Sequence, residues 1–353
     1  MTRGYGIGIR DLAQEVGLSV STVSRAMNAR SDASAATVER VREAAARLGY
    51  IPNQTGRTLR GGATNAVALV MPTATESTAA GETFFLTMAS GLQEILSAAD
   101  RDLVILPYGA SEDPDKYLST AVDRGLADAF IVAGTRQIDP RIDYLSERGI
   151  PFVSLGRTTQ ANHPWLDLDY EGVAAESVAR LAARGHQRIA LGISNSDVNN
   201  ATLFTDGYRR GLINQRFAFD PKLLILVPET IDGGYELGEQ LTSLPDRPTA
   251  IVLAQNTMVI GLYRYLNTHG QIPGRDLAII GFRKNPVLDL LTPSLTCFQV
   301  SLRDYGRRLG EIVLIQMGGS RPSLPQKTET TPPQEVWHMT LVPGDSDGPI
   351  RAI

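Results

Sequence analysis

The sequence has a single cysteine, Cys297, and only four histidines in 353 residues. One cysteine excludes an internal disulfide, and the scattered histidines offer no metal-ligand spacing, so we expect no metal site and a core-packing role for Cys297. The chain also lacks an apolar run long enough to cross a bilayer, and its start, MTRGYGIGIR, lacks the apolar core of a signal peptide. These absences predict a cytoplasmic protein with no membrane partner.

Motifs of common enzyme classes are missing as well. The sequence has no nucleophile elbow, no phosphate-binding GK[ST] loop and no paired metal ligands. The glycine-rich GYGIG near the start has no strand before it, so it lacks the context of a dinucleotide-binding loop. We therefore expect no catalytic residues, no cofactor and no enzymatic activity.

What the sequence does contain is two short helical patterns that meet at a glycine in IRDLAQEVGLSVSTVSRAMN, residues 9–28. Apolar residues at helical spacing mark the first helix, Gly17 allows the reversal, and Ser19 is a good N-cap for the second. A third helix is predicted to run from a Ser34 cap to Gly49. This layout is a helix-turn-helix headpiece, and small hydroxyl residues with Arg25 on the second helix suit contact with DNA.

The charge of this segment differs from that of the remaining chain. Residues 1–62 carry nine Arg and five acidic residues, a net charge of +4, whereas the whole chain carries −4. Electrostatic attraction to phosphates is therefore local to the headpiece. The alternative reading is an amphipathic helical hairpin inside a larger fold, but the terminal position and the charge favour DNA binding.

From residue 66 onward, apolar runs alternate with helical patterns. Runs that are apolar throughout and separated by helices indicate parallel sheets buried on both faces, and the length favours two doubly wound α/β subdomains. Ligands of such folds bind at the carboxyl ends of the strands, often between domains. The predicted strands are residues 66–71, 102–106, 129–133, 151–155, 188–193, 222–227, 249–254 and 277–282.

The sequence resembles the lac repressor/galactose repressor family of bacterial transcription regulators. The resemblance rests on LSVSTVSRAMN, LGYIPN and TLR in the first part, and on IPFVSLGR, RGHQRIA, DRPTAIVLA, LAIIGF and LTPSLT in the same order farther on. It implies a headpiece (1–52), a hinge helix (53–63) and a periplasmic-binding-protein-like core of two subdomains (64–345). The final segment DSDGPIRAI has little apolar periodicity, which predicts a loose tail (346–353).

The same resemblance implies a homodimer, with a tetramer as the alternative, that binds double-stranded operator DNA with one headpiece per half-site. Val20, Ser21 and Arg25 fall where the family reads base edges, and Leu59 where it wedges the minor groove. Gly56 replaces the alanine of many relatives, so this hinge helix is harder to form. Positions that usually hold the DNA backbone are Ser19, Thr22, Ser24, Asn28, Tyr50 and Asn53.

The effector implied by the resemblance is a small carbohydrate-like molecule, yet three cleft positions depart from the family. Phe204 stands in place of an arginine, Gln255 and Asn256 replace an Asn-Asp pair, and Arg283 and Lys284 replace two acids. The change toward positive charge favours an acidic or phosphorylated effector. The predicted effector-binding residues are Phe84, Phe85, Arg157, Phe204, Asn256, Arg283 and Gln299.

Three crossovers between the subdomains are expected near residues 157–164, 291–297 and 318–325. They give an N-subdomain of 64–160 with 295–320 and a C-subdomain of 161–294 with 321–345. A solute-binding protein would share this body, but it would carry a signal peptide and no headpiece; an α/β enzyme is the other alternative. The sequence leaves open the identity of the effector, whether it releases or strengthens DNA binding, and the operator sequence.

Overall fold

The computed structural model describes residues 7–27, 34–50, 64–73, 79–160, 162–318 and 331–350. The chain divides into two compact units, Met1–Thr64 and Asn65–Ile353. We call them the headpiece and the core, and each is described by itself. No helix within the described ranges is long and apolar enough to span a bilayer.

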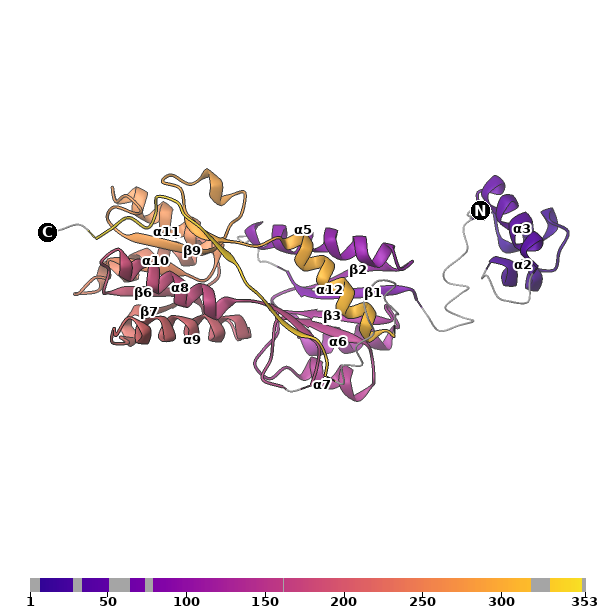
Figure 1. The fold of residues 1–353 in the computed structure, drawn as a ribbon, viewed down its shortest axis with the longest axis horizontal. Helices are drawn as coiled ribbons and strands as arrows, with labels where there is room; N and C mark the ends of the chain where they lie inside the picture. The colour runs from indigo at the N-terminus through magenta and orange to yellow at the C-terminus, as the bar shows by residue number, and fades with distance from the viewer. Residues whose placement is uncertain are drawn as a thin grey trace. The chain divides into compact units, whose positions relative to one another are not determined.

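The headpiece has three helices among its described residues, as predicted. α1 (Ile9–Glu15) ends before a turn at Gly17, whose φ of 62° lies in the left-handed region that glycine adopts without strain. α2 (Val20–Met27) follows, and α3 (Ala35–Leu48) begins at Ser34, whose hydroxyl accepts a backbone hydrogen bond of 3.2 Å as its N-cap. Their apolar faces meet in one small core (Figure 1). The residues buried there are Leu12, Ala13, Val23, Ala26, Val41, Ala44 and Ala45.

The described part of the core contains twelve strands and eight α-helices, with two short 3-10 turns. The strands are β1 (Ala66–Pro72), β2 (Asp102–Tyr108), β3 (Ala129–Ala133), β4 (Phe152–Leu155), β5 (Trp165–Leu168), β6 (Ile189–Ser194), β7 (Leu224–Val227), β8 (Ala250–Leu253), β9 (Ala278–Arg283), β10 (Thr296–Gln299), β11 (Gln334–Trp337) and β12 (Thr340–Val342). The helices are α5 (Ala79–Ser97), α6 (Pro114–Asp123), α7 (Pro140–Glu147), α8 (Tyr170–Ala183), α9 (Asn199–Asn214), α10 (Ile231–Ser243), α11 (Asn256–Thr268) and α12 (Leu302–Gln316), and the turns are η1 (Pro221–Leu223) and η2 (Leu288–Leu290).

These strands form two six-stranded sheets, with the orders β11-β5-β4-β3-β1-β2 and β12-β10-β9-β8-β6-β7. Neighbouring strands are parallel except β12, which runs antiparallel to β10. We call the half with the first sheet the N-subdomain and the half with the second sheet the C-subdomain; Figure 1 shows them side by side. The predicted fold class, a helical headpiece with an α/β core of two doubly wound subdomains, is confirmed.

Helices cover both faces of each sheet, which explains the uninterrupted apolar runs. Val67 and Leu69 of β1 join the apolar cluster of α5 and α12, whereas Ala68 and Val70 join that of α6 and α7. In the C-subdomain, α8 and α9 cover one face and α10 and α11 the other. Cys297 is buried in β10, as its predicted packing role requires. All eight predicted strands are present, and the four unpredicted ones, β5, β10, β11 and β12, have three or four residues each.

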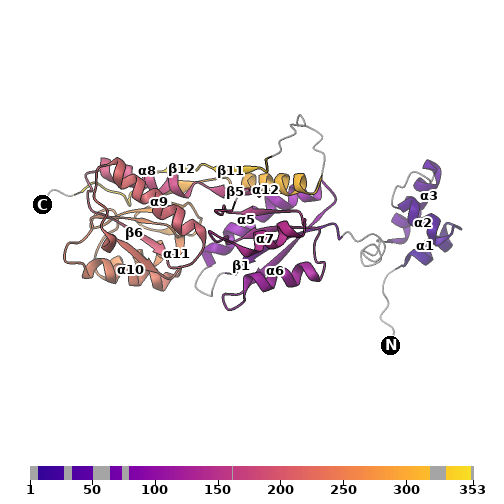
Figure 2. The ribbon, with the colours of Figure 1, turned by 90° about the horizontal axis from the view of Figure 1, so that it is seen from below.

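The three crossovers lie later in the chain than predicted. The chain passes between subdomains at Asp169 after β5, at Val300 and Ser301 after β10, and at His338 and Met339 between β11 and β12. The predicted positions, 157–164, 291–297 and 318–325, are wrong because β5 and β11 extend the first sheet and β10 stays in the second. Figure 2 shows β11 and β12 following one another along the two subdomains. The N-subdomain therefore ends at β5 and resumes with α12.

The predicted loose tail is also wrong for its described part. Ser346 and Asp347 are fully buried. The Ser346 hydroxyl donates to the Ile279 carbonyl at 2.7 Å, and the Asp347 carboxylate accepts a bond of 2.7 Å from Thr296 and pairs with Arg180 and Arg184. The segment docks through polar groups rather than through an apolar pattern, so hydrophobic periodicity gives no sign of it.

Removing the buried carboxylate of Asp347 should destabilise the core. Replacing Asp347 by Ala leaves two arginines and a buried hydroxyl without their partner, and we expect a loss of about 3 kcal/mol in the free energy of unfolding. Urea unfolding followed by circular dichroism measures this loss. Asp246→Ala is the control, because Asp246 is 80% exposed in its pair with Arg188, and it should cost less than about 1 kcal/mol. Equal losses in the two variants would contradict the assignment.

Candidate effector cleft and DNA interface

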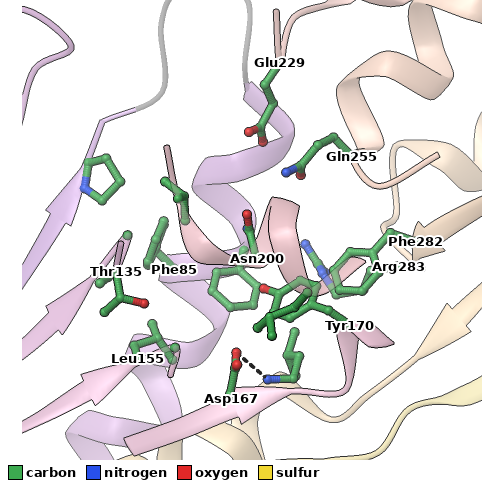
Figure 3. A pocket seen from close by; sticks show the side chains of 18 of the residues that line it. Phe85, Thr135, Leu155, Asp167, Tyr170, Asn200, Glu229, Gln255, Phe282 and Arg283 are labelled. Carbon is green, nitrogen blue, oxygen red and sulfur yellow. Dashed lines mark hydrogen bonds between the residues drawn. The ribbon is translucent and has the colours of Figure 1, made fainter. Parts of the chain in front are cut away.

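A cavity of about 230 Å³ lies between the two subdomains, where the carboxyl ends of both parallel sheets meet. Its position follows from the fold, because loops after parallel strands gather at one edge of a sheet. Figure 3 shows labelled side chains from both halves converging on it. The lining residues used below come from the ends of β5 and β9, the loops after β4, β7 and β8, the starts of α8, α9 and α11, and from α5 and α12.

Aromatic rings form the apolar walls of this cleft. Tyr170 and Phe282 stack with ring centroids 5.0 Å apart, and Phe84 meets Phe85 edge to face at 5.1 Å. Tyr305, fully buried, also lines the cavity and donates its hydroxyl to the Leu166 carbonyl at 3.0 Å. Flat apolar surfaces of this kind suit the C–H faces of a small ring-shaped ligand.

Arg157 forms ion pairs with Asp167 and Glu171 at the cleft. Nε of Arg157 lies 3.0 Å from Oδ2 of Asp167, and Nη2 lies 2.9 Å from Oε2 of Glu171. Burial raises the pKa of the Asp167 carboxyl to about 6 even though the Arg157 guanidinium opposes the shift. Because the Arg157 guanidinium lies next to these two carboxylates, they offset most of the positive charge that a bound ligand would meet there.

Arg283 supplies the second cationic side chain of the cleft. Its guanidinium carbon lies 5.1 Å from the centroid of the Phe84 ring, and Nη1 donates to the Lys284 carbonyl at 3.2 Å. The Asn256 side chain accepts from the Arg283 backbone amide at 3.4 Å. Burial lowers the pKa of the Arg283 guanidinium. Within the described chain it forms no ion pair.

Three buried polar atoms of the lining have no hydrogen-bond partner among the described residues: Nη2 of Arg157, which lies near Glu171 only as an ion pair, Oδ1 of Asn200 and Oγ1 of Thr257. Leaving such atoms unpaired costs about 1–3 kcal/mol each. An acceptor and a hydroxyl that still need partners, close to aromatic walls, suit a ligand rich in hydroxyl groups. Sequence reasoning missed Asn200 and Thr257, as it missed Glu229 in the same cleft.

The structure brings five of the seven predicted effector residues to this cleft: Phe84, Phe85, Arg157, Asn256 and Arg283. Phe204 is not among them, because it is 1% exposed on the inner face of α9 and packs edge to face on Phe282 at 5.8 Å. The preceding residue, Leu203, lines the cavity instead.

Gln299 also lies outside the cleft. It is the exposed last residue of β10 and pairs with Thr340 of β12. The pleat turns the preceding residue, Phe298, into the core, so Gln299 points outward to a shallow groove beside the crossovers. The expected polar contact with an effector is therefore not supported at this residue.

Besides the Arg157–Glu171 ion pair and the contact of Arg283 with Phe84, the two subdomains touch beside the cleft through the start of α9. The Asn199 amide donates to the Thr135 carbonyl, and its side chain Nδ2 donates to the Arg157 carbonyl, each at 2.8 Å. An isolated β-bridge joins Arg136 to Val198 beside them. These contacts hold Thr135 and Arg157 of the N-subdomain against the start of α9, so they form a clasp that closes the cleft.

In the headpiece, α2 buries Val23 and Ala26 and leaves Ser21 and Arg25 exposed one turn apart. Nε of Arg25 donates to the Ser21 carbonyl at 3.3 Å. The Ser19 hydroxyl caps the helix start, accepting from the Thr22 amide at 3.1 Å. Val20, Thr22, Ser24 and Tyr50 are half-buried. The remaining predicted DNA contacts, Asn28, Asn53 and Leu59, lie outside the described residues, as does the hinge at 53–63.

A helix-turn-helix unit and a ligand cleft between two parallel-sheet subdomains, carried by one chain, define the class of ligand-responsive transcription regulators. Residues 8–53 match the family described as bacterial regulatory proteins, lacI family, and residues 178–346 match a periplasmic binding protein-like domain. The chain is 32% identical over 329 residues to the HTH-type transcriptional regulator RafR of Escherichia coli, covering 92% of this chain and 96% of the relative. It belongs to the lacI family of bacterial regulatory proteins.

Further relatives and solved structures agree with this assignment. The HTH-type transcriptional regulator AglR of Rhizobium meliloti is 30% identical over 350 residues, 97% of this chain and 95% of that protein. A complex of the transcriptional regulator CelR with cellobiose aligns with a TM-score of 0.70 and 25% identity, over 96% of this chain and 99% of that one. The lac repressor dimer bound to operator and anti-inducer shares the fold, with a TM-score of 0.79 at 20% identity, over 98% and 100% of the two chains. These relatives are named regulators, not enzymes.

Replacing Asn199 by Ala should loosen the clasp. The substitution removes the side-chain bond to the Arg157 carbonyl, and one such bond contributes about 0.5–1.5 kcal/mol. We expect amides of residues 195–201 to exchange about 2- to 10-fold faster in hydrogen–deuterium exchange. Asn195→Ala is the matched control, because the exposed Asn195 side chain makes none of the contacts across the cleft. Unchanged exchange in Asn199→Ala would show that the clasp contributes nothing to closure.

Proposed function

We propose that this protein is a transcriptional repressor that binds operator DNA as a homodimer and is released by a neutral carbohydrate effector bound in the cleft. The observation that carries the proposal is the aromatic-walled cavity with unpaired Asn200 and Thr257 atoms, in a chain that also bears a helix-turn-helix. A tetramer is the alternative assembly. A corepressor role of the effector is the alternative direction of control.

The exposed strip of α2 is suited to the major groove. Ser21 and Arg25 lie on one side of the helix, while the buried Val23 and Ala26 anchor its other side. An arginine in this position can bind guanine through two hydrogen bonds. We therefore assign base reading to Val20, Ser21 and Arg25. Backbone contacts are assigned to Ser19, Thr22, Ser24, Asn28, Tyr50 and Asn53, and the minor-groove wedge to Leu59.

A neutral sugar fits the described cleft better than an acidic one. The sequence-based argument for an acidic or phosphorylated effector depended on both Arg283 and Lys284, but Lys284 does not line the cavity and lies 3.7 Å from Asp289. Arg157 is paired with two carboxylates, and Glu229 adds a negative group to the lining. The positive charge is therefore largely offset. The CelR complex with cellobiose supports a neutral sugar as the ligand class.

Release from DNA follows from closure of the cleft. A ligand that contacts both the N-subdomain lining and Asn200 or Thr257 binds the closed arrangement better than an open one, so it shifts the population toward closure. The subdomain rotation changes the spacing of the two headpieces in a dimer, and this spacing sets whether both half-sites can be bound together. The coupling is reciprocal, so operator DNA weakens effector binding by the same factor.

Replacing Arg25 by Ala tests the DNA interface. Loss of one bidentate base contact should lower operator affinity about 10- to 100-fold, because such a contact contributes about 1–3 kcal/mol. Fluorescence anisotropy with DNA from upstream of the gene measures the affinity at fixed salt. Arg47→Ala removes the same charge from α3, where Arg47 pairs with Glu15 at 2.6 Å, and it should change affinity only a few-fold. Equal losses of operator affinity in both variants would show that Arg25 contributes only general electrostatic attraction to DNA.

Sugar binding can be tested without knowing the operator. A neutral mono- or disaccharide at 100 times its dissociation constant should stabilise the native state by about 2.7 kcal/mol and raise its melting temperature. The same sugar should lower operator affinity in the anisotropy assay. Stronger stabilisation by a sugar acid or sugar phosphate would favour the acidic effector, and increased operator affinity would make the ligand a corepressor. A complete panel without any shift would contradict a carbohydrate effector.

A further inference from the structure

Glu229 is an acidic side chain of the cleft for which the described residues provide no hydrogen-bond or ion-pair partner. It follows β7 in the loop that leads to α10, and its carboxylate points into the cavity from the C-subdomain, beside Gln255 and opposite Asp167 (Figure 3). Asp167 is paired with Arg157 and accepts the Leu168 amide at 3.0 Å. Glu229 forms no hydrogen bond or ion pair with any residue in the described ranges.

The loop that carries Glu229 is held firmly. The Thr230 hydroxyl caps α10 by accepting from the Gly233 amide at 2.9 Å, and the Thr230 amide donates to the Pro228 carbonyl at 2.8 Å. A Cβ at Gly233 would lie 2.1 Å from that same carbonyl oxygen, so only glycine allows this close approach. The backbone on both sides of Glu229 is therefore held in place, which sets the direction in which its side chain leaves the loop.

No described cation neutralises this carboxylate. The charged and titratable groups around it are Tyr170 of α8, Arg283 of β9 with its guanidinium over Phe84, and the Arg157–Asp167 pair of the N-subdomain. Asp232 of α10 is paired with Arg264 at the surface. Partial removal from water, without an opposing charge, raises the pKa of the Glu229 carboxyl to about 7. Glu229 is exposed to the solvent of the cleft, so its carboxylate is accessible to hydrogen-bond donors of a ligand.

We propose that Glu229 is the specificity-determining residue of the effector site, accepting hydrogen bonds from two adjacent hydroxyl groups of a neutral sugar and rejecting sugars that carry a carboxylate or phosphate. This inference rests on the proposed carbohydrate effector. A carboxylate has two oxygens and several lone pairs, so it can bind two neighbouring hydroxyls at once. The same negative charge repels an anionic ligand in a site partly removed from water.

The test compares the full-length protein with Glu229→Gln, which keeps the shape of the side chain and removes the charge. Isothermal titration calorimetry at pH 8 uses two matched probe pairs, cellobiose with cellobionate and ribose with ribose 5-phosphate. The wild type should bind the neutral member of a pair at least 10-fold more tightly than the acidic member. Glu229→Gln should bind the neutral sugar at least 10-fold more weakly and should lose most of this discrimination.

Two controls make the result specific to Glu229. Glu239→Gln removes an exposed carboxylate from α10 and should leave both affinities unchanged, and unchanged melting temperatures show that each variant is folded. Protonated Glu229 is a poorer acceptor for two hydroxyls, so wild-type affinity for the neutral sugar should fall as the pH is lowered from 8 to 6.5. Most of this fall should disappear in Glu229→Gln.

Equal neutral-sugar affinity in wild type and Glu229→Gln, or preference of the wild type for the acidic probes, would overturn the role of Glu229 while leaving a sugar-responsive repressor intact. Failure of all four probes to bind either protein would overturn the carbohydrate assignment together with this inference. DNA binding is judged separately by the Arg25→Ala comparison, so the two failures can be told apart.

Discussion

Because helices cover both faces of each parallel sheet, the inner strands are largely apolar, and the charged groups of the cleft lie at or just beyond the carboxyl ends of the strands. This constraint determines where the charged residues of the cleft lie. Asp167 and Arg283 lie within the last two residues of β5 and β9. Arg157, Glu229 and Gln255 lie just after β4, β7 and β8. The crossovers set these two edges against each other, so these groups from five strands meet in one cleft. The apolar runs that build the sheets therefore also decide where a ligand can bind.

Long apolar runs made the fold predictable, and short strands made its details unpredictable. The run AVALVM forms β1, whose side chains are buried on both faces of the first sheet. A short run of apolar residues of this length is typical of a strand covered on both sides. By contrast, WLDL of β5 and QEVW of β11 hold four residues with polar groups among them; β5 forms a strand by pairing with the edge of β4, and β11 by pairing with β5. Pairing with a neighbouring strand is a tertiary event, which local sequence does not encode. The displaced crossovers follow directly from these two strands.

The site was predictable to the level of elements but not of single side chains. The helix carrying Phe204 does border the cleft, yet each residue turns about 100° around an α-helix, and this rotation puts Leu203 in the lining and Phe204 in the core. Glu229 was overlooked because an acid after a strand is common in solvated loops. Only the tight approach of Gly233 to the Pro228 carbonyl shows that this loop is fixed over the cavity. The docking of Asp347 was not predictable for a related reason. A segment that is held by polar contacts shows no hydrophobic periodicity in the sequence.

The energies of the cleft explain how a small ligand can control a large protein. The hydrogen bonds around Asn199 cross between the subdomains and each contributes about 0.5–1.5 kcal/mol; the Arg157–Glu171 ion pair and the contact of Arg283 with Phe84 cross beside them. In this closed arrangement Asn200 Oδ1 and Thr257 Oγ1 have no hydrogen-bond partner among the described residues, which opposes it by about 1–3 kcal/mol each. A hydroxyl-rich ligand removes that penalty only in the closed arrangement. Its affinity is therefore differential between the two states, and differential affinity is the sole means by which a ligand shifts such an equilibrium.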